Sequence, residues 1–478
     1  MKNLMRIIIL STVLITVTVF GQIYAYEYKG IDIRGFVSQG FLMTSDNNFF
    51  AQTEKGTTQF NEAAINFSAD VSDKLRIGTQ FLARDMGTIG NNEIILDWAV
   101  ADYRLNDKLG LMAGQMKFVH GLYNDTRDVD MLRTFILLPQ SVYNEAIRES
   151  SGSIQGVGLY GDIPLADMGS LNYDAQYGNI NLSNNKGAAR LLEDQWPFKN
   201  SATETDPLKR SLGMTMDVDN IDVKKTYAGS LKWITNLEGL VFGVSSYSYD
   251  FTSKCTTYLD ASTVTAVGTT LGSASLAGLG TGLDVFGTSL RVPDSKFDAK
   301  AKVYTASVEF TWRNLVLAAE YMKTTYNLSI TNELFGSTFS SSIDAKAVLV
   351  GGFERSGSKV KFDEFSSEGY YGSLAYRFTP WLEMGTYYSI YYPNKADKKG
   401  EDRVLRGLDL EEHRGWLKDI CATARFDITE NWTFKLEGHK MDGAAILQSE
   451  DNPEPDVATD EQYKKNWYLY AAKATFNF

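Results

Sequence analysis

The sequence ends in Trp467-Tyr468-Leu469-Tyr470-Ala471-Ala472-Lys473-Ala474-Thr475-Phe476-Asn477-Phe478, and this stretch decides the fold. Its even-numbered positions carry only Tyr, Ala and Phe, whereas its odd-numbered positions include Lys473, Thr475 and Asn477. Because successive side chains of a strand point to opposite faces, the alternation predicts a strand with one apolar and one mixed face. Its length suits a tilted strand that crosses a bilayer, for which about nine to eleven residues are enough.

The other end of the sequence predicts export from the cytoplasm. Lys2 and Arg6 precede an apolar run from Ile7 to Phe20, and small Ala25 follows shortly after. This pattern is typical of a secretory signal peptide over residues 1–25, which would leave residues 26–478 as the mature domain. An uncleaved anchor is the alternative, but the run is short of the ~20 residues that a spanning helix needs. An exported chain without other apolar helices can enter a membrane again only as a closed β-barrel.

Composition excludes several other classes of protein. Aromatic residues make up 13% of the 478 residues, which is far too many for a disordered chain. A mean hydropathy of -0.23 is too polar for a bundle of membrane helices. The net charge of -12 argues against a nucleic-acid partner, whose phosphates would need basic side chains. Three His and two Cys predict no elaborate metal site, no disulfide framework and no cofactor.

Alternating segments recur along the whole chain and predict an all-β fold, namely a transmembrane antiparallel β-barrel. The connections between these segments are alternately short and long, which is typical of barrels with short periplasmic turns and long extracellular loops. Eighteen strands are the alternative, if the connections 181–223 and 252–301 hide a hairpin. The sixteen predicted strands are 31–43, 57–71, 75–84, 93–105, 109–118, 153–162, 170–180, 224–234, 240–251, 302–312, 315–326, 367–378, 381–392, 415–427, 431–442 and 467–478.

Tryptophans cluster beside the predicted turns. Trp233, Trp312, Trp381 and Trp432 each lie next to a short connection. An indole ring is amphipathic, so rings at this level would form an aromatic girdle at the periplasmic interface of a barrel. The alternative is the ordinary enrichment of aromatic residues in soluble β proteins.

Strand parity then predicts which charged residues face the interior. Leu75, Ile77 and Phe81 share one apolar face, so Arg76 and Arg84 point the other way. A charge on the lipid face costs ~2–4 kcal/mol at mid-membrane, whereas a charge that lines water costs little. The interior is therefore predicted to be filled with water and lined by charges of both signs, without an evident preference for anions or cations. The predicted lumen-lining residues are Arg34, Glu62, Arg76, Arg84, Glu309, Glu320, Arg377, Glu383, Arg425, Lys435 and Lys473.

The third long connection, residues 119–152, holds an apolar block from Phe135 to Leu138 between charged residues. A loop in water gains nothing from such a block, so we expect the segment to fold against the barrel or into its lumen. Opposed charges inside a pore would narrow the passage and set the local electric field that ions meet there. An external cap or a subunit contact is the alternative location. The predicted constriction residues in this segment are Arg127, Asp128, Asp130, Arg133, Glu145 and Arg148.

Short motifs resemble known bacterial proteins. The last strand, with its terminal Phe478, resembles the C-terminal strand of bacterial outer-membrane barrels. Gly114-Gln115-Met116-Lys117-Phe118 before Gly121-Leu122 resembles a segment of the phosphate-selective porin group, and residues 121–143 look like porin-like proteins of Gram-negative bacteria. The resemblance implies a sixteen-stranded, usually trimeric barrel with an inward third loop and Lys117 near the constriction. Val119-His120 departs from that group's usual Pro and apolar pair, and no basic ladder is evident, so phosphate specificity is not implied.

These observations predict a porin of the bacterial outer membrane that lets small hydrophilic solutes or ions diffuse passively. The expected partners are outer-membrane lipid and lipopolysaccharide, the solutes and two further copies in a homotrimer. A surface receptor or adhesin that uses the long loops is the alternative function. An enzyme is not expected, because His120, His413 and His439 stand in no recognisable catalytic motif. Cys255, in a predicted loop, and Cys421, on a predicted strand, are expected to be unpaired.

Overall fold

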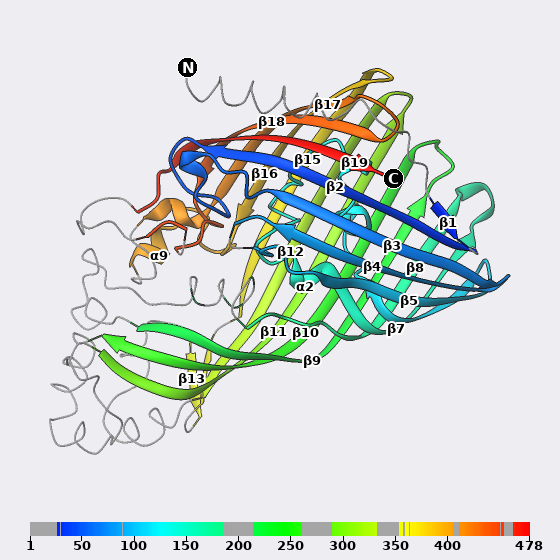
Figure 1. Cartoon of the computed structure of the whole chain (residues 1–478). Helices are drawn as coiled ribbons and strands as arrows, with labels where there is room; N and C mark the ends of the chain where they lie inside the picture. The colour runs from blue at the N-terminus through cyan, green and yellow to red at the C-terminus, as the bar shows by residue number, and fades with distance from the viewer. Residues whose placement is uncertain are drawn as a thin grey trace, which may run out of the picture.

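The strands of the protein form one antiparallel sheet that closes on itself (Figure 1). The computed structural model describes residues 26–28, 30–87, 89–184, 187, 189, 193, 214–260, 289–331, 353–356, 359–362, 364–405, 411–449, 451–453 and 462–478. The predicted signal peptide, residues 1–25, lies outside the described residues.

Sixteen of the described strands form the wall of the barrel, and this confirms the predicted fold class and strand number. Each strand pairs with the next one in the wall, and the pairing of the last with the first closes the ring. These strands are β2 (Ile31–Thr44), β3 (Asn61–Ser72), β4 (Leu75–Asp85), β5 (Ile95–Asn106), β6 (Leu109–Lys117), β7 (Ser153–Pro164), β8 (Ser170–Asn179), β9 (Met214–Ile234), β10 (Leu240–Asp260), β11 (Ser289–Trp312), β12 (Leu315–Thr331), β15 (Phe365–Thr379), β16 (Leu382–Tyr392), β17 (Leu417–Asp427), β18 (Trp432–Gly443) and β19 (Asn466–Asn477).

The ends of the chain show how the ring closes. The N–H of Phe478 donates to the carbonyl of Gly35, and the N–H of Gly35 donates to the carbonyl of Phe478, both at 3.0 Å. The alternation in the last strand therefore predicts its place correctly. A short strand, β1 (Tyr26–Tyr28), adds to β2 outside the ring.

Three strands extend further toward the loop side than the sequence predicts. β9, β10 and β11 run on beyond the rest of the wall in Figure 1. The eighteen-strand alternative is wrong for the described residues, because the extra length continues existing strands. A small hairpin of β13 (Phe353–Ser356) and β14 (Lys359–Phe362) pairs with the end of β12 and adds nothing to the ring. Cys255 consequently lies on β10 and not in a loop, and both cysteines are buried.

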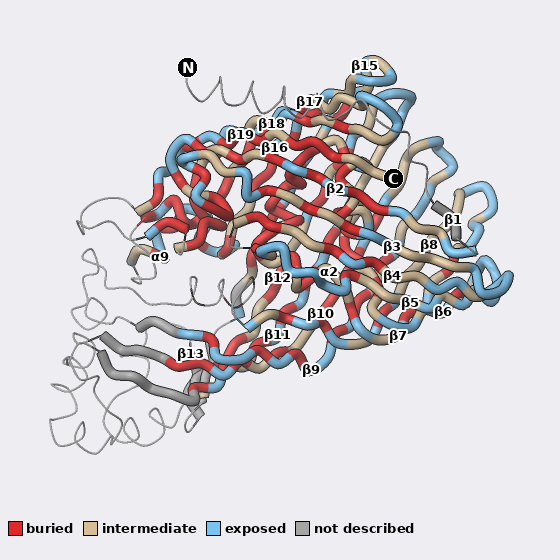
Figure 2. Tube along the Cα trace, viewed as in Figure 1, coloured by how far each residue is buried: buried red, intermediate tan, exposed pale blue. Residues whose placement is uncertain are grey.

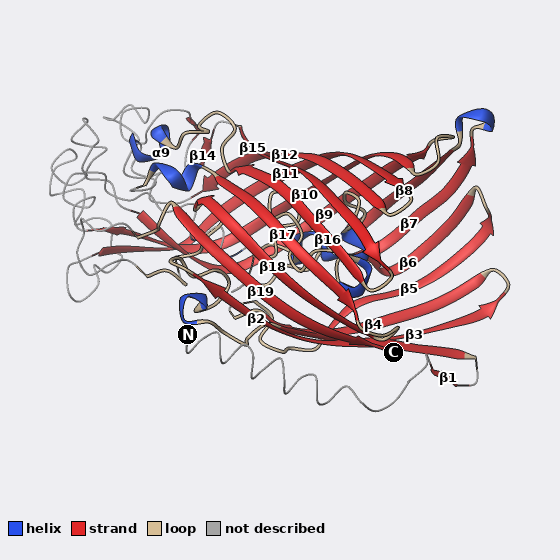
Figure 3. Ribbon diagram, turned by 90° about the horizontal axis from the view of Figure 1, so that it is seen from above, coloured by secondary structure: helices blue, strands red, loops and turns tan. Residues whose placement is uncertain are grey.

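Helices are short in the described part of the chain. None of them combines the length and the apolar character of a membrane-crossing helix. They are η1 (Thr53–Lys55), η2 (Asn124–Thr126), η3 (Asp130–Leu132), α2 (Glu149–Gly152), η4 (Ala166–Met168), α9 (Glu401–Leu405) and η5 (Glu412–Gly415), and Figure 3 shows them among the strands.

The outer face of the wall is apolar, which a transmembrane barrel requires. Outward positions such as Val37, Ile77 and Val244 are 55%, 45% and 54% exposed. Near the turns, Trp312 and Trp381 are also more than half exposed, as expected for an aromatic girdle. Only lipid makes so much exposed apolar area favourable, so this face is the membrane-contacting surface.

The interior differs between the two halves of the barrel (Figure 2). In the turn half, Arg34 is exposed, and the side chain of Arg76 is 58% exposed. In the loop half, inward side chains are buried, and apolar clusters around Trp467 and Phe118 fill the space. The prediction of a wet interior is wrong for this loop half. The reason is that the segment between β6 and β7 packs against the inward faces of several strands.

Candidate functional site

Residues 119–152 connect β6 to β7, and we call this segment the inner loop. It contains η2, η3 and α2. Its hydrogen bonds reach the inward faces of strands from all around the ring, including β3, β10, β12, β16, β18 and β19. The contacts divide into four groups.

The first group centres on Glu320, on β12. Its carboxylate accepts the N–H of Leu122 at 2.9 Å and the hydroxyl of Tyr143 at 2.5 Å. It also accepts the hydroxyls of Ser307 and Tyr371, at 2.6 and 2.7 Å. A buried carboxylate is stable only with such donors, so this one fixes two separate parts of the inner loop, at Leu122 and at Tyr143, to β12.

The second group holds the apolar block on β18, four strands further round the ring than β12. Glu437, on β18, accepts the N–H groups of Ile136 and Leu137 at 2.8 and 2.9 Å. The ring of His439 lies between two carboxylates, with Nε2 3.1 Å from Glu437 and Nδ1 3.1 Å from Asp419. Two backbone donors on one carboxylate fix the direction of the chain at this point.

Potential metal ligands meet within this second group. Cys421, Glu437 and His439 bring their ligand atoms within 4.8 Å of one another, and all three are buried. The oxygens of Glu437 already accept N–H groups of the inner loop. The arrangement therefore acts as an anchor for that loop.

The third group surrounds Asp130. Its carboxylate lies 3.2 Å from the Lys435 ammonium, 3.6 Å from that of Lys473 and 2.9 Å from the Thr475 hydroxyl. Burial disfavours the charged form of Asp130, but the two lysines and Arg133 outweigh it and hold the pKa well below its usual range. Asp130 is thus a charged tether between the inner loop and β18 and β19.

The fourth group is a network of alternating charges. Arg148 pairs with Asp128, and it lies 3.4 Å from Glu145. Arg127 pairs with Glu145 at 2.8 Å, and Lys117 pairs with Asp128. Burial, together with Arg84 and Arg127, lowers the pKa of Arg148 to about 9. The network extends to the wall through the ion pairs of Arg84 with Glu145, Glu62 with Arg148 and Lys473, and Asp97 with Lys117.

The structure brings all seven predicted constriction residues into these groups. Six of them are buried, with Arg127 only 2% exposed and Asp128 3% exposed, and each has an ion-pair partner. Their charges hold the inner loop in place and are not free toward water. The set is Lys117, Arg127, Asp128, Asp130, Arg133, Glu145 and Arg148.

The predicted lumen-lining residues divide between the two halves. Those that contact the inner loop are Glu62, Arg84, Glu309, Glu320, Glu383, Arg425, Lys435 and Lys473. Arg34 lies on the turn side, where it pairs in register with Asn66. Arg76 is 3.9 Å from Asp70, and Arg377 bridges Glu383 and Asp427 at 2.5 and 2.7 Å.

Strand parity predicts that Glu437 faces inward, and the site residues that sequence reasoning left out are His439, Tyr143 and Asp97. A usable signal existed for His439, because it continues the inward parity of Lys435 and Glu437. Tyr143 and Asp97 gave no such signal, since one lies in a loop and the other at a register shift between β4 and β5.

Water reaches the inner loop from the turn side. Asp125 and Lys232, on β9, lie 3.9 Å apart inside the ring, with side chains 52% and 33% exposed. This ion pair on the inward face is therefore accessible from the turn half of the interior.

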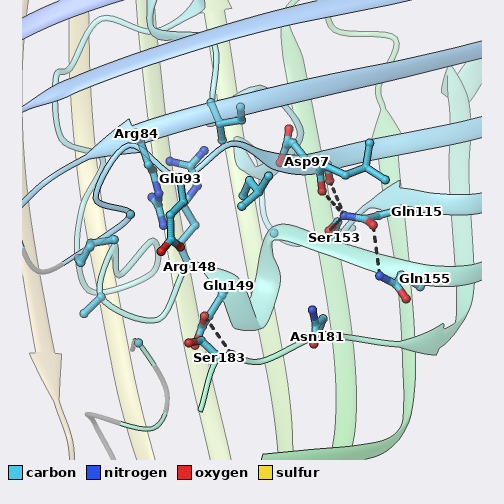
Figure 4. A pocket seen from close by; sticks show the side chains of 18 residues that line it. Arg84, Glu93, Asp97, Gln115, Arg148, Glu149, Ser153, Gln155, Asn181 and Ser183 are labelled. Atoms are coloured by element: carbon cyan, nitrogen blue, oxygen red, sulfur yellow. Dashed lines mark hydrogen bonds between the residues drawn. The ribbon is translucent and has the colours of Figure 1, made fainter. Parts of the chain in front are cut away.

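A pocket of about 740 Å³ lies on the loop side, beside β4, β5 and β6 (Figure 4). Arg84 and Arg148 line it together with Glu93 and Asp97, so its wall carries both signs of charge. Gln115 donates to Ser153 at 3.0 Å at its edge. The charge network of the inner loop therefore borders this pocket through Arg148 on the loop side.

Comparisons with known proteins found similarity among solved structures. No protein-family model matches the chain, and no curated protein matches it. Among solved structures, it is similar to the anion-selective porin from Comamonas acidovorans, with 8% identity and a TM-score of 0.49 over 94% of this chain and 99% of that chain. It is similar to Salmonella typhi OmpF in complex with daunomycin, with 14% identity and a TM-score of 0.47 over 94% and 97%. It is also similar to the outer membrane channel DcaP of Acinetobacter baumannii, with 8% identity and a TM-score of 0.46 over 95% of this chain and 100% of that chain.

The closed ring, its apolar outer face and its aromatic girdle define the class. The protein is a transmembrane β-barrel of the bacterial outer membrane, with sixteen wall strands among the described residues.

Proposed function

We propose that the protein is a porin-like channel through which small hydrophilic solutes or ions diffuse down their own gradients. One observation carries the proposal: inward-facing charged residues remain exposed to solvent although the wall around them is closed. Arg34, the Arg76 side chain and the Asp125–Lys232 pair all belong to this set. Charged groups on an inner face are stable where water reaches them or where partners offset their burial, and the exposure of this set favours a hydrated passage.

The inner loop is the proposed constriction. It divides the solvent-filled turn half from the loop-side pocket, so a solute would pass along its charged groups. Fixed opposed charges at a narrow point give a pore its selectivity. The groups proposed to act there are Lys117, Arg127, Asp128, Asp130, Arg133, Glu145 and Arg148.

Three further proposals rest on sequence alone. Residues 1–25 are proposed to be a cleaved signal peptide, residues 26–478 the single barrel domain, and the assembly a homotrimer. The likeness of residues 114–122 to the phosphate-selective group supports a porin but no preference for phosphate, because the basic ladder of that group is missing. No catalytic role is proposed for any residue.

A plugged surface receptor is the second candidate, and the tight packing of the loop half favours it. Buried residues such as Trp467 and Phe118 fill this part of the interior, and the inner loop is fixed at four places. Such a barrel would present its long loops to a ligand without conducting. Most of the loop residues concerned lie outside the described residues.

Single-channel recording separates the two candidates. The full chain without residues 1–25 is refolded and added to a planar bilayer under a salt gradient. Discrete current steps are expected, and the sign of the reversal potential gives the ion preference. A folded barrel without steps would exclude the channel and favour the receptor.

A further inference from the structure

Four side chains of β17 and β18 meet on the inner face of the wall, within the second group of inner-loop contacts. They are Asp419 and Cys421 on β17 and Glu437 and His439 on β18, and each is at most 5% exposed. Cys421 and His439 stand directly opposite each other in the register of the two strands. Because residues two apart on a strand share a face, the wall itself holds the four groups together.

Three of these side chains have the spacing of metal ligands. The thiol of Cys421, a carboxylate oxygen of Glu437 and a ring nitrogen of His439 all lie within 4.8 Å of one another. A tetrahedral Zn²⁺ with bonds of about 2.0–2.3 Å holds its ligand atoms about 3.3–3.8 Å apart, so small side-chain rotations bring the three onto one ion. Both cysteines of the chain lie among the described residues, and Cys421 forms no disulfide. Its thiol is therefore available as a ligand.

The surroundings of His439 require a cation. Its Nδ1 lies 3.1 Å from both oxygens of Asp419, and its Nε2 lies 3.1 Å from an oxygen of Glu437. A neutral ring has only one N–H, so its other nitrogen would turn a lone pair toward a carboxylate. Such a contact is repulsive unless a second proton or a metal ion lies there. With the N–H directed at Asp419, Nε2 and Glu437 are placed to share a metal ion.

Asp419 has the position of a carboxylate that orients a metal-bound histidine. Such a carboxylate accepts the N–H of the second ring nitrogen, which fixes the tautomer and makes the first nitrogen a better ligand. The hydroxyl of Tyr387 donates to Asp419 at 3.0 Å and holds it in turn. Phe135, Tyr387 and Cys421 form an apolar cluster beside these groups. Surroundings of low polarity strengthen the attraction between an ion and its ligands.

We propose that Cys421, Glu437 and His439 bind one Zn²⁺ ion on the inner face of the wall. Thiolate, imidazole and carboxylate are all ligands of Zn²⁺, whereas Ca²⁺ and Mg²⁺ take oxygen ligands. The ion replaces the thiol proton and the proton between the ring and Glu437, and a water molecule completes its tetrahedron.

The ion would strengthen the attachment of the inner loop. Glu437 accepts the N–H groups of Ile136 and Leu137, and a carboxylate oxygen has a second lone pair for the metal. One carboxylate would thus connect the apolar block of the loop, the ion and two strands of the wall. The proposal concerns metal binding, so it does not depend on conduction.

Retention of Co²⁺ by the refolded full chain, without an affinity tag, tests the proposal. Co²⁺ serves as the probe because it enters Zn²⁺ sites, and a cobalt–thiolate bond adds a charge-transfer absorption band in the near ultraviolet. The chain is refolded in mild detergent with Co²⁺, and loosely bound ions are removed by gel filtration. The variants are Cys421→Ser, His439→Gln and Asp419→Asn. The matched controls are Cys255→Ser, on β10, and His413→Gln, in η5. The difference in gel mobility between unheated and boiled protein first shows that each variant folds.

One Co²⁺ per chain is expected to stay bound and to give the charge-transfer band, and one equivalent of Zn²⁺ should displace it. Cys421→Ser should lack the band, and His439→Gln should bind Co²⁺ at least about tenfold more weakly. Asp419→Asn should keep the band but bind about 10 to 100 times more weakly, as expected for a residue that orients a ligand. Cys255→Ser and His413→Gln should behave as the unaltered protein does.

Three outcomes would overturn the proposal. If the unaltered protein retains no Co²⁺, the cation between His439 and Glu437 is a proton only. Retained Co²⁺ without a charge-transfer band would place the ion away from Cys421. Loss of the band in Cys255→Ser would also exclude the site, because Cys421 is the single cysteine of that variant. This last measurement decides the matter even if Cys421→Ser does not fold.

Discussion

Single charged residues determine how the inner loop is held, because most of them are buried. Lys435 and Lys473 are 0% and 1% exposed, yet both reach Asp130. A buried ion pair adds little net stability against an apolar substitute, but the loss of one partner leaves a charge without compensation. The consequences of substitution in the four groups therefore depend on which partner remains.

Lys473→Met is expected to lower the free energy of unfolding by about 3–5 kcal/mol, because Asp130 and Glu62 would stay buried with less compensation. Urea titration of the refolded barrel measures this change. The control is Arg104→Met, whose exposed partner Asp107 lies 3.2 Å away, and which should change the free energy of unfolding by less than about 1 kcal/mol. Equal effects of the two substitutions would contradict the buried role of Lys473.

His120 should make the inner loop sensitive to acid. Its Nε2 lies 3.4 Å from the carbonyl of Val142 and its Nδ1 lies 3.3 Å from the hydroxyl of Thr305, as a neutral ring requires. Burial lowers the pKa of His120 from 6.5 to about 4. The unfolded loop therefore binds a proton that the folded loop does not, between these two pKa values. The contribution of His120 to the free energy of unfolding is fully present above pH 6.5. It falls as the pH drops toward 4, by about 3 kcal/mol in total.

Proteolysis of the inner loop at pH 7 and at pH 4.5, with a protease active at both, measures this dependence. The unaltered protein should be cleaved faster at the lower pH. The His120→Gln protein cannot take up this proton, so its cleavage rates at pH 7 and at pH 4.5 should differ less. The same acid-dependent gain in cleavage in both proteins would assign the effect to other groups.

At the scale of the elements, the strands could be predicted and the contacts of the inner loop could not. Alternation is a local pattern, so all sixteen wall strands were found from the sequence. The ends of β10 and β11 were missed because the segment beyond Phe251 is rich in Ser, Thr and Gly and shows no apolar face, whereas the missed start of β9, residues 214–223, does alternate between apolar and polar residues. Ile136 and Glu437 are 301 positions apart, and only the closure of the ring brings them together. Parity gave the direction of Glu437, but nothing in the sequence gave its partner.

Glu437→Gln is expected to loosen the apolar block of the inner loop. Gln keeps the size but offers one acceptor oxygen to two backbone donors, Ile136 and Leu137. Their amide hydrogens should exchange about 10 to 100 times faster, in keeping with about 1.4–2.8 kcal/mol for a hydrogen bond to a charged group. Glu238→Gln, an exposed turn residue, is the control and should leave the exchange unchanged. Unchanged exchange in both would show that Glu437 is no anchor.

At the scale of the whole molecule, a closed ring of hydrogen bonds makes the barrel very resistant to detergent. Every wall strand has two neighbours, so no edge is open to unfold from. Unheated protein in mild gel conditions is expected to migrate differently from boiled protein. The control is the same protein denatured in guanidinium and not refolded, which should migrate as the boiled form does. Identical migration of all samples would contradict a stable closed barrel.

Ion selectivity belongs to the whole molecule, because it depends on the sum of the charges that line the passage. Neutralising Arg127, Arg133 and Arg148 leaves the acids of the inner loop in excess and should shift the reversal potential toward cations. The matched variant D128N/D130N/E145Q removes three acids from the same network and should shift it toward anions. Shifts of the reversal potential in opposite directions would require the network to face the conducting path. A variant that fails to fold would carry no current and would therefore show no shift at all. If both variants conduct with an unchanged reversal potential, ions take a path away from the inner loop, and the constriction must be sought among the turn-side residues Arg34, Arg76 and Arg377.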